Sequence, residues 1–143
     1  MKIFISHSKY DNGTVEKTIQ KLDEYGIDYW VDLEQLDNDR VNERINEGLE
    51  NATHFLLVWS KNARESDWVK EERNAASSQD YKDKLQIFSF KLDNTSLPAL
   101  IFSNRRYFEI NTKKLDTQIE NFIRSLDGLE LETQVKIFKN RSG

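Results

Sequence analysis

Apolar residues follow two alternating patterns along this chain. Short, nearly continuous apolar runs occupy residues 2–6, 27–31, 55–59 and 85–90, and a fifth strand is expected within residues 99–110. Between these runs, apolar residues recur every three or four positions, which is the spacing of one face of an α-helix. Strands that are apolar throughout are buried on both faces, so the alternation predicts a parallel sheet covered by helices on both sides.

The predicted helices carry recognisable end signals. Gly26 directly follows the first helical face, where glycine commonly ends a helix. Ser66 precedes Asp67, so a capping side chain and an acid in the first turn predict that a helix begins there. The helical faces are Val15, Ile19, Leu22 and Tyr25; Val41, Ile45 and Leu49; and Leu115, Ile119, Phe122, Ile123 and Leu126.

The organisation of the chain is that of one domain with an extension. A length of 143 residues fits a single domain, and no internal repeat or low-complexity segment is present. We therefore expect a domain over residues 1–126. Residues 127–143 contain apolar side chains but end in the polar sequence KNRSG, which allows either an added packed element or a linker to a further domain.

Composition narrows the class of function. Lys and Arg number 21 against 25 Asp and Glu, and this acidic balance argues against a nucleic-acid partner. The absence of cysteine excludes disulfides and thiolate catalysis, and with only two histidines no metal site is expected. No apolar run approaches the roughly 18 residues of a membrane span, and the N-terminus lacks the apolar core of a signal peptide. We expect a cytoplasmic protein without a membrane partner.

Ligands of an open parallel sheet bind beyond the carboxyl ends of its strands, so the loops there are the first places to examine. No glycine-rich phosphate loop occurs, which argues against a Rossmann dehydrogenase and a P-loop NTPase. A two-component receiver domain would need acidic residues where the chain has Ser6, His7 and Ser60. A serine hydrolase is disfavoured because neighbours on a strand, such as Ser6 and His7, point to opposite faces.

Trp68 and Glu72 lie four residues apart on a predicted helix and therefore share one face. From spacing alone, the more common situation is a core tryptophan beside a solvated surface carboxylate.

Four sequence boxes, in order over residues 1–126, resemble those of TIR (Toll/interleukin-1 receptor) domains. They are F-I-S-H-S-x-x-D at residues 4–11, Y-W-V-D at residues 29–32 with Leu36 following, FLLVWS at residues 55–60, and S-x-W-x-x-x-E at residues 66–72. One departure is that Asp37, Asn38 and Asp39 stand where the family often has glycine. The resemblance implies a flavodoxin-like fold with a five-stranded parallel sheet and helices on both faces.

The chain is most similar to the bacterial NAD-cleaving immune-effector type of TIR domain. This resemblance implies an NAD⁺ glycohydrolase or ADP-ribosyl cyclase acting in anti-phage or innate immune defence, with NAD⁺ as substrate, no cofactor, and Glu72 at the position of the family's catalytic glutamate. A single carboxylate suits this reaction, because nicotinamide leaves as a neutral molecule and only the ribosyl cation needs electrostatic stabilisation. The expected substrate-binding residues are Ser6, His7, Ser8, Asp11, Trp30, Asp32 and Trp68.

Two further expectations accompany this interpretation. Trp30 is equally well explained as a core residue of the sheet. TIR domains also associate with one another, which implies contacts through the loop of residues 33–40, from Leu33 to Arg40; its acidic side chains would keep self-association weak or ligand-dependent. The alternative function is a non-catalytic adaptor that signals through homotypic contacts between TIR domains.

Overall fold

The computed structural model describes residues 1–35, 41–98, 106–126 and 128–142. Within these residues, five parallel strands form one sheet in the order β2-β1-β3-β4-β5. This arrangement confirms the predicted flavodoxin-like fold. The strands are β1 (Lys2–Ser6), β2 (Asp28–Val31), β3 (His54–Trp59), β4 (Gln86–Lys91) and β5 (Tyr107–Glu109).

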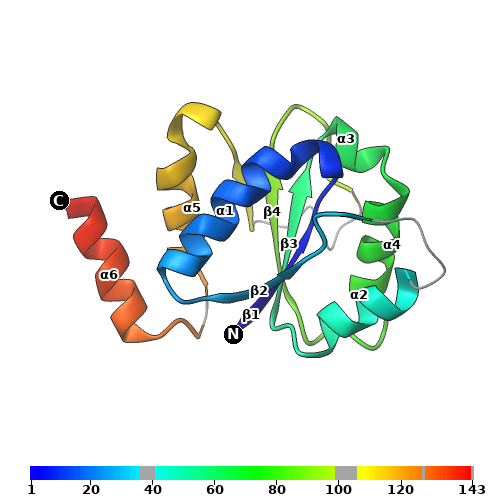
Figure 1. Ribbon diagram of the computed structural model, residues 1–143, viewed down its shortest axis with the longest axis horizontal. Coiled ribbons are helices and arrows are strands. Elements are labelled where there is room, and N and C mark those ends of the chain that lie inside the picture. The colour runs from blue at the N-terminus through cyan, green and yellow to red at the C-terminus, as the bar shows by residue number, and fades with distance from the viewer. Residues whose placement is uncertain (36–40, 99–105, 127, 143) are drawn as a thin grey trace.

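Helices cover both faces of the sheet, as Figure 1 shows. One face packs against α1 and α5, and the other against α2, α3 and α4. The helices are α1 (Asn12–Glu24), α2 (Val41–Glu50), α3 (Lys61–Arg64), α4 (Asp67–Ala76), α5 (Leu115–Arg124) and α6 (Leu131–Ser142), with short 3₁₀ helices η1 (Lys9–Asp11) and η2 (Thr112–Lys114).

The central strand is the most deeply buried part of the sheet. All six residues of β3 are buried because β1 and β4 flank it and helices cover both its faces. Leu56 and Val58 face the α1 and α5 side, whereas Leu57 faces the α2 and α4 side. The prediction that residues 55–59 occupy the interior is confirmed.

The two predicted helix ends have the expected geometry. Gly26 has a φ of +66°, and Ile27 N donates to Leu22 O at 2.9 Å. The glycine ends α1 in this way and turns the chain into β2. At the other site, Ser66 Oγ accepts a hydrogen bond of 3.2 Å from Val69 N, so Ser66 caps α4 as predicted.

Trp30 is a packing residue of the sheet. Its ring stacks on Phe4 with 4.7 Å between ring centroids, and Gly48 of α2 lies directly against it. A Cβ at position 48 would come within 2.5 Å of the indole. Of the two sequence-based explanations for Trp30, the structure supports core packing, on the face that also holds α4.

The chain continues beyond residue 126 into α6, which lies at the outer edge of the molecule next to α5 (Figure 1). Ile137 of α6 is fully buried in the core cluster that contains α1 and α5. None of the helices in the described part of the chain combines the length and the apolar character that a membrane span requires.

Candidate functional site

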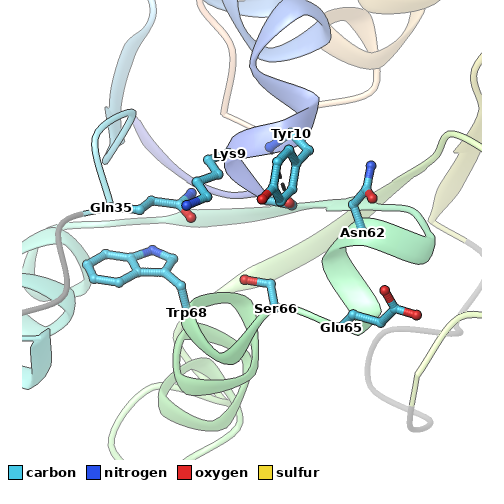
Figure 2. Close-up of a pocket in the computed structure, with 8 residues that line it drawn as sticks. Lys9, Tyr10, Gln35, Asn62, Glu65, Ser66 and Trp68 are labelled. Atoms are coloured by element: carbon cyan, nitrogen blue, oxygen red, sulfur yellow. Dashed lines mark hydrogen bonds between the residues drawn. The ribbon is translucent and has the colours of Figure 1, made fainter.

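A pocket of about 330 Å³ opens at the carboxyl edge of the sheet, where the loops after β1, β2 and β3 meet the start of α4. This is the edge at which the fold predicts a ligand, and the volume is at the lower end of small-molecule sites. Figure 2 shows Lys9 and Tyr10 on one side of the pocket and Ser66 and Trp68 on the other. The lining residues are Ser8, Lys9, Tyr10, Gln35, Asn62, Glu65, Ser66 and Trp68.

Glu72 lies one helical turn beyond Trp68 on α4, and it is buried with an exposed fraction of 1%. The expectation of a solvated carboxylate, drawn from spacing alone, is therefore wrong. Ser6 Oγ donates a 2.8 Å hydrogen bond to Glu72 Oε1. Alternation along β1 explains the contact, because Ser6 points to the same face as Phe4, which is the face that α4 covers.

The protonation of Glu72 is strongly perturbed. Burial raises the pKa of this carboxyl well above its usual value of 4.5, because the charged form loses its hydration. The Ser6 hydroxyl and the Trp68 indole favour the charged form and oppose the rise, whereas the charge of Asp32 adds to it. The Ser6 contact is a formed hydrogen bond; Trp68 Nε1 is buried and has no hydrogen-bond partner of good geometry among the described residues.

Asp32 is buried at the end of β2 and anchors the loop that follows. Its Oδ1 accepts a 2.9 Å hydrogen bond from Gln35 N, and its Oδ2 lies 2.7 Å from the Arg44 guanidinium of α2. The Arg44 guanidinium thus offsets the charge of a carboxylate that is buried close to Glu72.

Gln35 connects two of the loops that form the pocket. Its backbone adopts a left-handed φ of 47°, and its side-chain amide donates a 2.5 Å hydrogen bond to His7 O. A non-glycine residue in this conformation is strained and is held there by its surroundings. Sequence reasoning missed Gln35; the available signal was a polar side chain three residues after Asp32, suited to a turn closed by the aspartate.

His7 and Asp11 stabilise the loop after β1 through their side-chain contacts. His7 is buried, and its Nε2 lies 2.6 Å from Asn12 Oδ1 at the start of α1. Burial lowers the pKa of His7 below 6.5, against the opposing effects of Asn12, Asp11 and Asp32. Asp11 Oδ2 accepts a 2.6 Å hydrogen bond from Ser60 Oγ, which ties this loop to the end of β3.

The predicted site residues thus separate into groups by position. Ser8 and Trp68 line the pocket, and Ser6 contacts Glu72 on the helix behind Trp68. His7, Asp11 and Asp32 hold the loops in place, and the partly buried Trp30 packs against the core outside the pocket lining.

Tyr10 and Lys9 line the pocket but are not among the substrate-binding residues expected from the sequence. Tyr10 is 75% exposed, and the Lys9 ammonium lies 5.5 Å from the centre of its ring. The signal for both was their place in the polar segment SHSKYD, immediately after the first strand. Together with Trp68 they give the pocket two aromatic faces and one cation.

Comparison with known proteins gives one family match. A family model described as TIR domain matches residues 3–126. The TIR domain of the Toll-related receptor TRR-2 from Hydra magnipapillata superposes with a TM-score of 0.66 at 15% identity, covering 85% of this chain and 94% of that one. The TIR domains of the activated Roq1 resistosome, which directly recognises the pathogen effector XopQ, align with a TM-score of 0.48 at 15% identity, covering 99% and 79%. No functionally curated protein matches the chain.

Proposed function

Because this chain belongs to the TIR domain family, we propose that it cleaves the bond between nicotinamide and ribose in NAD⁺, acting in anti-phage or innate immune defence. The observation that carries the proposal is the buried Glu72, which lies directly behind a pocket wall and is hydrogen-bonded to Ser6. Burying a carboxylate costs folding free energy. Strongly perturbed carboxyl groups beside a cleft are typical of catalytic sites.

The lining of the pocket suits a dinucleotide. Aromatic faces such as those of Tyr10 and Trp68 stack on nicotinamide or adenine rings, and the Lys9 ammonium suits a phosphate. The two aromatic side chains come from opposite sides of the pocket (Figure 2).

In the proposed reaction, the bond between ribose C1′ and the nicotinamide nitrogen breaks, and its electron pair stays with the nitrogen. Nicotinamide leaves neutral, and the ribosyl cation is stabilised by the ionised Glu72. Capture by water, with loss of a proton to solvent, gives ADP-ribose. Capture by another atom of the same nucleotide gives a cyclic product.

The positively charged nicotinamide ring favours the ionised form of Glu72, so bound NAD⁺ opposes the effect of burial on its pKa. Glu72 is not among the pocket-lining residues, and the substrate therefore reaches it only when the wall formed by Trp68 or the loop after β1 shifts. Association with another TIR domain through residues 33–40 is the proposed means of this shift. Residues 36–40 of that loop, including Leu36 and Arg40, lie outside the described residues.

The burial of Glu72 also favours a second function. A glutamate that is 1% exposed and hydrogen-bonded to Ser6 serves equally well as a structural group in a non-catalytic adaptor that signals through contacts between TIR domains. Turnover of NAD⁺ separates the two functions.

The decisive experiment incubates the purified protein with NAD⁺ over a range of protein concentrations and separates the products by chromatography. Wild type should release nicotinamide, and Glu72→Gln should lower the rate by roughly 100–1000-fold, the usual cost of removing one preorganised electrostatic group. Glu71→Gln is the matched control, because Glu71 is an exposed neighbour about 100° around α4.

Glutamine keeps the shape of the side chain, so both variants should fold like wild type, which circular dichroism verifies. Equal NAD⁺ turnover in wild type and Glu72→Gln would exclude the catalytic role of Glu72. Wild type that leaves NAD⁺ intact even at high protein concentration, or when fused to an oligomerising partner, would favour the adaptor.

A further inference from the structure

Helix α6 presents two different faces. Its inner face is fixed to the end of α1: Ile137 is fully buried, and the Lys136 ammonium donates to the carbonyl of Glu24. The same ammonium lies 5.4 Å from the centre of the Tyr25 ring. These contacts fix the rotation of α6 about its own axis and thereby determine which side chains it turns outward.

The outer face of α6 is apolar. Leu131, Val135 and Phe138 are 74%, 43% and 65% exposed. Spacings of four and three residues place them in one stripe along the helix, on the side away from Ile137. Figure 1 shows α6 at the outer edge of the molecule. A contiguous apolar stripe on an accessible helix is typical of an interaction surface, whereas scattered exposed apolar residues are not.

Charges beside the stripe are arranged so that the helix complements itself. Glu132 lies near its beginning and Lys139 near its end, and both side chains are exposed on the same flank. In an antiparallel pair centred close to Val135, Leu131 faces Phe138 of the second copy, and Glu132 faces Lys139 of the second copy. In a symmetric parallel pair the two copies would turn this flank to opposite sides of the seam, so Glu132 and Lys139 of one copy would not face those of the other.

From this arrangement we infer that α6 is a self-association surface, through which two copies of this chain form a symmetric antiparallel helix pair. Two-fold symmetry uses the same patch on both copies, as the centred stripe and its two symmetry-related charge pairs require. The antiparallel arrangement also places opposite ends of the two helix dipoles side by side.

The stripe consists of three large side chains on one helix, so it buries less than the roughly 1,600 Å² of a standard stable interface. The pair is therefore a weak dimer that forms as protein concentration rises. It leaves the pocket at the carboxyl edge of the sheet open, since none of the residues lining that pocket belongs to α6.

Sedimentation equilibrium over a concentration series tests the charge arrangement. Glu132→Lys and Lys139→Glu should each weaken the dimer, by roughly two- to fivefold for each exposed ion pair lost. The double variant restores opposite charges in the same geometry and should return the dissociation constant to that of wild type. Lys113→Glu, an exposed charge change on η2, is the control and should have no effect.

A cysteine crosslink tests the position of the symmetry axis. The chain has no cysteine, so Val135→Cys introduces a single thiol next to the axis. Mild oxidation should give a disulfide-linked dimer, because helices packed 8–10 Å apart bring facing positions within disulfide reach. Tyr107→Cys, at a 45% exposed position on β5, is the control and should crosslink far more slowly.

Three results would overturn the inference: a wild-type protein that stays monomeric at millimolar concentration, a double charge variant no better than the single variants, or equal crosslinking at positions 135 and 107. Each result is independent of NAD⁺ turnover. Circular dichroism of every variant identifies any that fails to fold.

Discussion

Ser6 Oγ donates a 2.8 Å hydrogen bond to Glu72 Oε1, which joins the end of β1 to the second turn of α4 across 66 residues of sequence. The bond favours the charged carboxylate and opposes the rise in pKa that burial causes. Ser6 therefore shifts the balance between the neutral and ionised forms of the one group that the proposed reaction requires to be ionised.

Ser6→Ala should shift the pH dependence of NAD⁺ cleavage. The acid limb of kcat/KM reports the pKa of Glu72 in the free enzyme, since activity is lost when the carboxylate becomes protonated. Loss of the hydroxyl raises that pKa further, so the limb should move to higher pH. Rates measured across pH with Ser77→Ala as control test this, because the Ser77 hydroxyl donates to Arg73 O at the other end of α4. An unmoved limb would mean that Ser6 does not influence the ionisation of Glu72.

Glu72→Gln should stabilise the fold at neutral and alkaline pH. The pKa of Glu72 is raised in the folded state, so the folded protein binds more protons than the unfolded chain above pH 4.5. In wild type this contribution is fully present below pH 4.5 and is lost as pH rises through the folded-state pKa. Glutamine cannot ionise, so the Tm advantage of the variant should be near zero in acid and grow with pH. A Tm difference that shrinks as pH rises would contradict the burial of this charge.

Gly48→Ala should destabilise the protein. The added Cβ would lie 2.5 Å from the Trp30 ring and 2.7 Å from the Phe4 ring, which is fully buried in the core and stacked on Trp30. Overpacking of this kind costs about 1–3 kcal/mol in unfolding free energy, which urea titration measures. Gly13→Ala is the matched control in α1, where no atom lies within 4 Å of the added Cβ. It should be neutral or stabilising by up to about 1 kcal/mol, because alanine favours a helix.

Leu57→Ala should cost about 2–5 kcal/mol of unfolding free energy, because it leaves a cavity in the central strand between β1 and β4. Leu131→Ala removes the same atoms from a side chain that is 74% exposed and should cost far less in the monomer. Denaturant unfolding at low protein concentration measures both. Equal costs would contradict the placement of Leu57 in the core.

The sequence by itself determined the strands, the ends of helices and the edge of the sheet that holds the pocket. Each of these features depends mainly on residues that are close together in the sequence. The continuous apolar run of residues 55–59 favours a buried strand. Gly26 ends a helix through hydrogen bonds to residues just before it, and Ser66 caps the helical turn that follows it. The crossover rules of parallel sheets then bring the loops after β1, β2 and β3 together.

Only the tertiary structure decided what individual side chains do. Spacing places Trp68 and Glu72 on one face, but whether that face meets water or Ser6 depends on how α4 docks onto the sheet. For the same reason, Trp30 packs against Phe4 and Gly48 rather than lining the pocket, and Gln35 reaches across to His7. Burial and pKa depend on contacts between residues far apart in sequence, and local periodicity carries no information about which distant residues will meet.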